Sequence, residues 1–369
     1  MTLLHAADLH LRAEGRERDY GLAVLDEIIS IARQERADVL LFAGDLFESY
    51  DDAEALRSVV AEKIAELPTG TAAYLLPGNH EFLRAGGRRF HRLEFGRMAV
   101  AAEEPLSISR VHDAELLFVP HQAGYGNYAE WGVPARKLRH RVVVAHATVA
   151  GLFFDESGEE GTSFMDADLL SHLEADYVAL GHIHAGRSFT VGEPREGRAS
   201  RVDAVYPGSA RVWRKGESGP RSVALVTLDD AGVEWHLRTL STAGEYRSVV
   251  VLVEPDGSIG TDLEAIPLGP ADYASCSLVG VVEDDATLRR VAEEVHQVLA
   301  ARSRVIEVTT EDAVLIDGVS EEPIVRRFLE VWRRHGESLR TGDEDARRLW
   351  YRAREVGLRT VKQVIEQKR

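Results

Sequence analysis

Five short motifs in the first half of the chain carry eight side chains that can bind a metal ion or transfer a proton. They are Asp8-Leu9-His10, Gly44-Asp45, Gly78-Asn79-His80-Glu81, the single His146, and Gly181-His182-Ile183-His184. Each motif comes directly after an apolar run, where a strand is expected to end. Mixed His, Asp and Asn ligands without a thiolate suit Mn²⁺, Fe²⁺ or Zn²⁺ better than soft metals. The motifs therefore predict a divalent metal site.

The spacing of these residues indicates what the metal would do. In an extended backbone Asp8 and His10 point to the same side, and His182 and His184 repeat this arrangement. A carboxylate such as Asp45 can bridge two ions about 3.5–4 Å apart, and such a pair holds the attacking and leaving oxygens of an in-line displacement. We therefore expect two-metal hydrolysis of a phosphoester.

An ordinary structural role explains each motif when it is taken alone. A Gly-Asn-His-Glu segment is common turn chemistry, and a single histidine such as His146 is more often a hydrogen-bonded core residue. The occurrence of all five motifs, each at a predicted strand end, favours the metal site.

Strands and helices alternate over the first 190 residues. Apolar runs predict strands at 3–7, 39–43, 72–76, 141–145 and 177–180, and helical periodicity predicts helices at 20–33 and 53–67. This alternation indicates α/β architecture. Ligands of open α/β sheets bind at the carboxyl ends of the strands, so the five motifs can converge on one crevice.

Strands dominate the pattern after about Ser188. Runs at 188–191, 202–206, 223–228 and 233–240 predict a second sheet packed on the first. A first domain is expected at 1–243 and a small α+β capping domain at 244–319, with strands at 248–254, 276–282 and 304–309 around a helix at 285–301. Residues 320–369 show two further helical patterns and form a third segment.

Composition limits the class of protein. The chain has 369 residues, 44% of them hydrophobic, and no apolar stretch approaches the length of a membrane span. The first motif follows Met1 so closely that no secretory signal is expected. One cysteine, Cys276, excludes an internal disulfide framework. These features predict a cytoplasmic protein with no membrane partner.

The net charge of −17 argues at first against a nucleic-acid partner. The charge is uneven, however, because residues 321–369 hold 13 Lys and Arg against 9 Asp and Glu. Part of the remaining negative charge is metal-binding carboxylate, which a bound cation would offset.

The ordered motifs resemble those of the calcineurin-like metallophosphoesterase superfamily. Within it, four segments resemble the nuclease subunit of double-strand-break repair complexes, the bacterial SbcD type and its archaeal and eukaryotic counterparts: Ala6-Ala7-Asp8-Leu9-His10, Gly44-Asp45-Leu46-Phe47, the run 177–184, and Tyr206-Pro207-Gly208-Ser209. The resemblance covers about residues 1–240. It implies a four-layer α/β/β/α sandwich, followed by the capping domain and C-terminal helices.

The resemblance also implies roles for the motif residues. One ion would be held by Asp8, His10, Asp45 and His184, and the second by Asp45, Asn79, His146 and His182. His80 would not bind metal but would stabilise the transition state and protonate the leaving oxygen. Two positions depart from the nuclease pattern: Glu48 stands where a histidine is usual, and Glu81 stands where an aspartate is usual.

A basic stretch with interleaved aromatics follows the third motif. We expect its arginines to contact the DNA backbone, namely Arg84, Arg88, Arg89 and Arg92, although a solvated helix start is the alternative. Helical patterns at 323–335 and 343–367 each carry an apolar face. They either pack on the capping domain or, as in the resembling family, bind the coiled coil of an SMC-like ATPase.

The sequence thus predicts a Mn²⁺-dependent DNA exonuclease, with endonuclease activity as a further expectation, acting as a homodimer in a repair complex. A phosphomonoesterase or nucleotide phosphodiesterase on the same fold is the first alternative, favoured by Glu81 and the acidic charge. A non-catalytic interaction scaffold is the second, and the complete set of candidate ligands argues against it.

Overall fold

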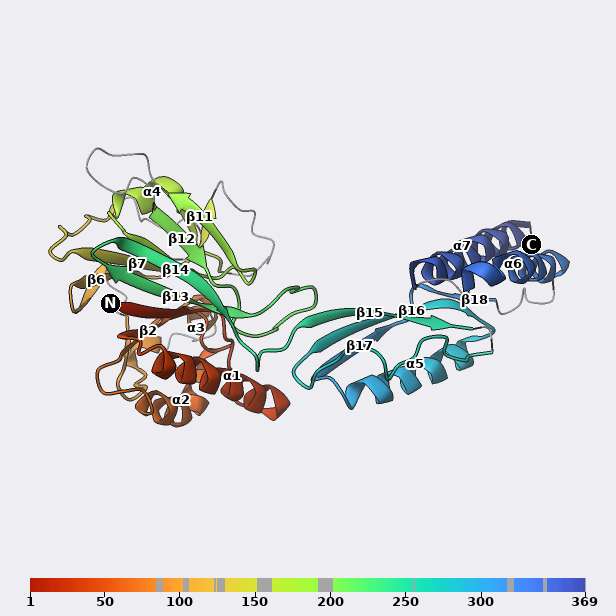
Figure 1. The fold of residues 1–369 in the computed structure, drawn as a ribbon, viewed down its shortest axis with the longest axis horizontal. Coiled ribbons are helices and arrows are strands. Elements are labelled where there is room, and N and C mark those ends of the chain that lie inside the picture. The colour runs from red at the N-terminus through yellow and green to blue at the C-terminus, as the bar shows by residue number, and fades with distance from the viewer. Residues whose placement is uncertain are drawn as a thin grey trace. The chain divides into compact units, whose positions relative to one another are not determined.

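The computed structural model describes residues 1–83, 89–101, 106–122, 124, 130–150, 161–191, 202–254, 256–316, 322–340 and 344–368. The chain divides into two compact units, Met1–Glu245 and Tyr246–Arg369. The first unit contains two large sheets with helices, and the second contains a smaller sheet with helices (Figure 1).

The first sheet has six strands in the order β14-β13-β1-β2-β3-β4. Strands β1 to β4 are parallel to one another, and β13 pairs antiparallel with β1. Their bounds are β1 Thr2–Ala6, β2 Val39–Ala43, β3 Ala72–Leu76, β4 Met98–Val100, β13 Ser222–Asp229 and β14 Gly232–Thr239.

The second sheet also has six strands, in the order β11-β12-β10-β7-β6-β5. The four inner strands are parallel, and the edge strands β5 and β11 are antiparallel to their neighbours. The bounds are β5 Ser107–Val111, β6 Ala114–Val119, β7 His140–His146, β10 Tyr177–Gly181, β11 Arg187–Val191 and β12 Val202–Tyr206. Strands β8 (Thr148–Ala150) and β9 (Phe164–Asp166) form a separate pair.

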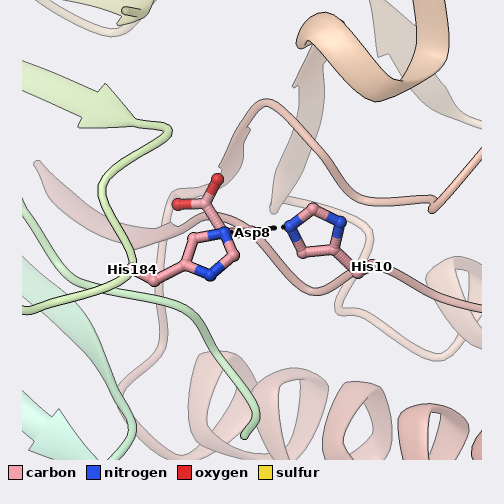
Figure 2. Close-up of side chains that lie close together, drawn as sticks. All are labelled: Asp8, His10 and His184. Atoms are coloured by element: carbon pink, nitrogen blue, oxygen red, sulfur yellow. Dashed lines mark hydrogen bonds between the residues drawn. The ribbon is translucent and has the colours of Figure 1, made fainter. Parts of the chain in front are cut away.

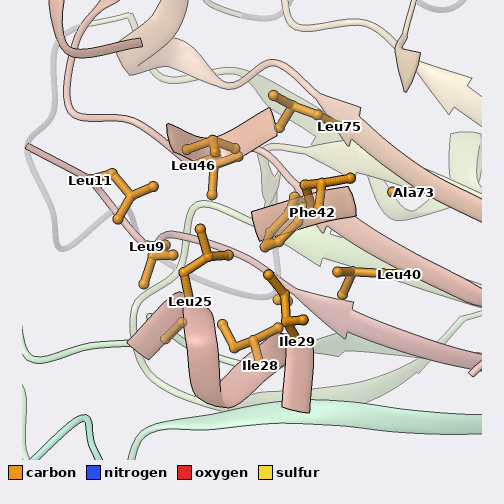
Figure 3. Close-up of a cluster of buried hydrophobic side chains, with 14 of the residues drawn as sticks. Leu9, Leu11, Leu25, Ile28, Ile29, Leu40, Phe42, Leu46, Ala73 and Leu75 are labelled. Atoms are coloured by element: carbon orange, nitrogen blue, oxygen red, sulfur yellow. The ribbon is translucent and has the colours of Figure 1, made fainter. Parts of the chain in front are cut away.

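Hydrophobic contacts stack these elements in four layers. Helices α1 (Gly15–Gln34) and α2 (Tyr50–Ala65) cover the outer face of the first sheet, where Leu25 and Ile28 pack with Phe42 (Figure 3). Leu41 and Phe118 belong to the core between the two sheets. Helix α4 (Ala167–His172) covers the second sheet. The predicted α/β/β/α sandwich is confirmed.

The predicted membership of the second sheet was wrong in part. Only β11 and β12 of the late strands lie in it, whereas β13 and β14 extend the first sheet beside β1. Strand β13 is buried on both faces, since Leu225 packs toward the helices and Val226 toward the other sheet. A strand of this kind fits an interior position, but its pairing with residues more than 200 positions away has no local sequence signal.

The second unit is a parallel sheet covered on both faces. Its strands are β15 (Tyr246–Val253), β16 (Tyr273–Val282), β17 (Val305–Thr309) and β18 (Ala313–Leu315). Helix α5 (Asp285–Ala300) packs on the face that carries Val251, and α6 (Pro323–Arg340) and α7 (Glu344–Lys368) pack on the face that carries Leu252 and Val281. The C-terminal helices therefore share a core with the capping sheet. None of the described helices is long and apolar enough to cross a membrane.

Candidate metal centre

The five motifs lie at the carboxyl ends of β1, β2, β3, β7 and β10. The first three strands are neighbours in one sheet, and the last two are neighbours in the other. Because the two sheets face each other, their strand ends bring together residues that are as much as 174 positions apart in sequence. A short helix, α3 (Asn79–Leu83), carries the third motif.

The backbone at the site is not the extended chain that the sequence predicted. Asp8, His10 and Asp45 have φ of 54°, 47° and 49°, and His182 has a φ of 97°. Non-glycine residues rarely adopt positive φ, and clusters of them mark functional sites at which the surrounding structure holds the strain. The Asp-x-His pair therefore converges through left-handed turns after the strand, and strand pleating is not the reason.

Two glycines make room for the ring of His146. A Cβ atom on Gly44 would lie 2.0 Å from Nδ1 of His146, and one on Gly181 would lie 2.7 Å from the same nitrogen. Gly44 also has a φ of +93°. Both motif glycines are therefore required by close approach to a candidate ligand.

Asp8, His10 and His184 form the first group of candidate ligands (Figure 2). The Nε2 atoms of His10 and His184 face each other at 3.1 Å. The Asp8 carboxylate accepts hydrogen bonds from the backbone nitrogen of His182, at 2.9 and 3.1 Å to its two oxygens. One donor atom from each of the three residues lies within 4.8 Å of the others.

Asp45, Asn79, His146 and His182 form the second group. Nε2 of His146 lies 3.0 Å from Oδ1 of Asn79 and 3.1 Å from Oδ2 of Asp45. Nδ1 of His182 lies 3.3 Å from the same Asn79 oxygen. The structure thus brings all seven predicted ligands together in two adjoining groups.

Burial and mutual contact perturb these groups strongly. Burial raises the pKa of Asp8 to about 6 and lowers the pKa of His10 to about 4. Burial opposes ionisation of Asp45 and His146 as well, but their contact outweighs it. The pKa of His146 rises to about 10, and that of Asp45 falls well below its ordinary value. Buried carboxylates beside imidazoles of this kind are typical of functional sites.

The donor set fits divalent metal ions. It combines imidazole nitrogens with carboxylate and amide oxygens and includes no sulfur, which suits Mn²⁺, Fe²⁺ or Zn²⁺. Asp45 contacts His146 in the second group, and its charge also acts on His10 in the first. Asp45 is therefore placed to belong to both groups.

His80 lies at the edge of this centre. Its backbone nitrogen donates to Oδ1 of Asp45 at 3.0 Å, and its ring meets that of His10 edge to face at 4.6 Å. Nδ1 of His80 lies 3.0 Å from the backbone oxygen of Glu48 and 3.3 Å from its carboxylate. The imidazole is 8% exposed, so it reaches the surface while the neighbouring ligand His10 is fully buried.

Three residues outside the predicted ligand set support the centre. Glu48 lies 3.1 Å from Nδ1 of His10, and Glu217 lies 2.5 Å from Nδ1 of His184. Ser209 donates to the backbone oxygen of Asp8 at 3.0 Å, which gives the Tyr206–Ser209 motif a physical role. Glu217 carries no sequence signal of its own, whereas Glu48 was visible as a departure from the family pattern.

Glu81 joins two loops of the site. Its fully buried carboxyl group accepts hydrogen bonds from the backbone nitrogens of Gly78, Asp45 and Phe47 at 2.8, 3.2 and 3.1 Å. Burial, with the nearby charge of Asp45, raises the pKa of Glu81 to about 8. The side chain is therefore occupied by the protein backbone.

A pocket of about 390 Å³ opens beside the first group. His182 and His184 line it together with four cationic side chains, namely Arg187, Arg214, Lys215 and Arg221. A cationic wall next to candidate metal ligands suits a phosphorylated substrate.

The arginines expected to contact DNA have different surroundings. Arg84 and Arg88 lie outside the described residues, whereas Arg89 and Arg92 are exposed at the 3₁₀ turn Phe90–Arg92. Arg97, farther along, donates to the carbonyl oxygens of Ile64, Leu67 and Pro68 at the end of α2. Its role is to cap that helix.

A family model confirms the character of the site. Residues 1–186 match the model described as calcineurin-like phosphoesterase. This range contains the five motifs and both groups of candidate ligands. Metal-dependent phosphoester hydrolysis is the chemistry of that family.

Three curated relatives extend the comparison at modest identity. The DNA double-strand break repair protein Mre11 of Methanosarcina mazei is 24% identical over 92% of this chain and 54% of its own length. Two proteins of Bacillus subtilis also match: the uncharacterized metallophosphoesterase YhaO is 24% identical over 64% of this chain and 60% of its own, and the SbcD component of the nuclease SbcCD is 26% identical over 61% and 66%. The chain thus spans between about half and two thirds of these relatives. It belongs to the calcineurin-like phosphoesterase family.

Proposed function

We propose that the protein is a Mn²⁺-dependent DNA exonuclease that cleaves phosphodiesters at two metal ions and acts as the nuclease subunit of a DNA repair complex. The observation that carries the proposal is a complete two-group ligand set with His80 at its edge, beside a cation-lined pocket. Two of the three relatives are named as a DNA break repair protein and a nuclease.

In this proposal Asp45 is shared between two metal positions. Asp8, His10 and His184 complete the first position, and Asn79, His146 and His182 complete the second. When bound, the two ions would orient the phosphodiester and stabilise charge on its attacking and leaving oxygens. Burial of the ligands excludes bulk water from all but the open side of the centre.

His80 is the proposed proton donor. The backbone oxygen of Glu48 accepts the Nδ1 proton of His80 at 3.0 Å, which fixes the ring and leaves Nε2 as the atom that serves the leaving oxygen. The hydrogen bond between the His80 amide and Asp45 fixes the main chain at the same place. His80 would therefore keep its position relative to the ligands during turnover.

An extended polyanionic substrate suits the surroundings of the centre. Arg187, Arg214, Lys215 and Arg221 line the pocket next to His184, and Arg89 and Arg92 are exposed near α3. Phosphate contacts of this kind position a strand without reading its sequence. They favour DNA over a small phosphomonoester.

Partner binding is proposed for the C-terminal helices. They pack on the capping sheet through Trp350 and Leu358, yet large apolar side chains remain exposed on them, namely Ile324, Val331, Leu349, Val356 and Val364. An apolar stripe that stays exposed after the helices have packed suits a coiled-coil partner. We assign this face to an SMC-like ATPase, and we further propose a homodimer. A DNA substrate and the single buried Cys276 accord with a cytoplasmic location.

The first alternative is a phosphomonoesterase or nucleotide phosphodiesterase. Glu81 no longer favours it, because its carboxyl group bonds three backbone amides and is buried away from the pocket. The second alternative, a scaffold without activity, conflicts with buried ligand groups that retain their full donor set.

One assay separates these functions. Purified protein is given Mn²⁺ with linear single-stranded DNA, linear duplex DNA, circular single-stranded DNA or p-nitrophenyl phosphate. We expect nucleotide release from linear DNA that His80→Ala abolishes, and nicking of the circle would add endonuclease activity. Faster hydrolysis of p-nitrophenyl phosphate than of any DNA would favour the first alternative, and no hydrolysis at all would favour the scaffold.

A further inference from the structure

The two histidines that face each other in the first ligand group are each held from behind by a carboxylate. Their Nε2 atoms lie 3.1 Å apart, and their Nδ1 atoms point outward. Glu48 lies 3.1 Å from Nδ1 of His10, and Glu217 lies 2.5 Å from Nδ1 of His184. Each carboxylate fixes its imidazole in the tautomer that has a proton on Nδ1 and a lone pair on Nε2.

Both carboxylates are themselves held in place. The backbone nitrogen of Glu48 donates to the oxygen of Leu11 at 3.0 Å, and the residue is only 5% exposed. The second oxygen of Glu217 accepts from the backbone nitrogen of Trp213 at 2.7 Å. The Trp213 ring stacks on His10 with a centroid distance of 5.4 Å and an interplanar angle of 4°. The loop from Trp213 to Glu217 therefore fixes both histidines.

The second ligand group is supported differently. Nδ1 of His146 lies 2.8 Å from the backbone oxygen of Ala43, which is a neutral acceptor. Nδ1 of His182 faces the Asn79 amide oxygen at 3.3 Å. Both histidines of the first group thus have a carboxylate at Nδ1, whereas His146 has a carbonyl oxygen in that place.

We propose that Glu48 and Glu217 are positioning residues that make the Asp8–His10–His184 position bind Mn²⁺ more tightly than the Asp45–Asn79–His146–His182 position. A carboxylate behind a ligating imidazole orients the ring and raises its basicity, and its removal typically weakens metal binding about 10–100-fold. This inference rests on the two-metal site of the proposed function and adds to it an order of affinity.

The inference also accounts for the departure at Glu48, where the resembling nucleases usually have a histidine. Here the side chain is buried against His10 and lies 3.3 Å from Nδ1 of His80, with Arg12 3.5 Å from its other oxygen. Glu48 thus acts through two histidines and does not face the pocket.

Calorimetric titration of the metal-stripped full chain with MnCl₂ tests the inference. For the unmodified protein we expect two classes of site. Glu48→Gln and Glu217→Gln should each weaken the tighter class about 10-fold or more while changing the weaker class less than about threefold. Glu48→Ala and Glu217→Ala should weaken it further, because the amide of Gln still accepts a hydrogen bond. Glu234→Gln, at an exposed carboxylate on β14, is the matched control and should change neither class.

Melting temperature gives a second readout that does not depend on activity. Metal-free Glu217→Gln should melt near the metal-free parent, but its rise in melting temperature on adding Mn²⁺ should be smaller. Equal weakening of both classes, or unchanged affinities in both Gln variants, overturns the inference and leaves the proposed nuclease standing. A parent protein that binds fewer than two Mn²⁺ ions overturns the two-metal site itself, and the inference with it.

Discussion

The carboxyl group of Glu81 lies 3.2 Å from the backbone nitrogen of Asp45 and accepts its hydrogen bond. It also accepts from Gly78 and Phe47, so one buried side chain ties the loop after β2 to the loop after β3. These two loops carry Asp45, Asn79 and His80. Glu81 therefore sets the distance between the shared ligand and the proposed proton donor.

Replacing Glu81 should destabilise the protein more than its small contact area implies. In Glu81→Ala three buried amides lose their acceptor, which costs about 1–3 kcal/mol for each unsatisfied group. Urea unfolding should show a lower midpoint, and Mn²⁺ binding should weaken. Glu81→Gln keeps an acceptor and should lie between the two. A Glu81→Ala protein as stable as the parent would show that the amides find other partners.

Replacing His80 should separate catalysis from binding. His80→Ala should lower kcat on DNA by about 10²–10⁴-fold, the contribution of a general acid. Its Mn²⁺ affinity should be unchanged, because His80 is outside both ligand groups as proposed. His236→Ala, at an exposed histidine of β14, is the control for a lost imidazole. A His80→Ala enzyme that loses Mn²⁺ as well would instead place His80 among the ligands.

Removing metal should affect both activity and stability. Asp8 and Asp45 are fully buried, and a cation that binds only the folded state stabilises it. EDTA should abolish DNA hydrolysis and lower the melting temperature, and Mn²⁺ at about 100 times its Kd should restore about 2.7 kcal/mol. Full activity after exhaustive chelation would contradict the metal-dependent mechanism.

Exposed arginines near α3 should contribute to the salt dependence of DNA binding. Arg89→Ala combined with Arg92→Ala should reduce the slope of log K against log salt by about 0.7 per lost phosphate contact on single strands. Arg97→Ala should instead lower stability, since its guanidinium caps α2. Arg238→Ala, at an exposed arginine of β14, is the control for lost charge. An unchanged slope in the double variant would remove these arginines from the DNA interface.

Acid should weaken the core ion pair between Glu115 and Arg141. Burial alone would raise the pKa of Glu115, but hydrogen bonds from Arg141 outweigh it and lower that pKa below its ordinary value. The pair therefore stabilises the fold fully above the unfolded pKa of about 4.3, and this stabilisation is lost as pH falls through the lower folded value.

Glu115→Gln tests this pH dependence, because it leaves Arg141 fully buried without its counter-charge. At pH 7 the loss of free energy of unfolding should be about 3–5 kcal/mol. The difference from the parent, measured by urea unfolding, should narrow as the pH is lowered below about 4, where the unfolded carboxyl group takes up its proton. A constant difference from neutral to strongly acidic pH would mean that the carboxylate does not contribute through its charge.

Local sequence was enough to predict much of the fold. Strands at 39–43 and 72–76 coincide with β2 and β3 because a buried parallel strand is a short apolar run between turn residues. The antiparallel pairing of β13 with β1 was missed because it joins residues that have no local relation. Helix α1 starts at Gly15, five residues before the predicted start, since its first turn is polar and has no apolar periodicity.

Basic residues were less predictable than candidate ligands. Arg211 follows the Tyr206–Ser209 motif and could have lined a substrate groove, but it is fully buried, pairs with Glu17 at 2.8 Å and donates to the backbone oxygen of His10 at 2.7 Å. An arginine can bind phosphate, cap a helix or brace a loop with the same guanidinium. Its role depends on which acceptors surround it in the folded chain.

The sequence by itself determined the chemistry of this protein, because the types of Asp8, His10, Asp45, Asn79, His146, His182 and His184 and their places after apolar runs are local properties. Only the tertiary structure decided how those residues are divided. It sets Nε2 of His10 against Nε2 of His184, although the two are 174 positions apart, and it places Glu48 and Glu217 behind them. These contacts depend on two sheets facing each other and on left-handed turns at the strand ends, which short-range patterns do not encode.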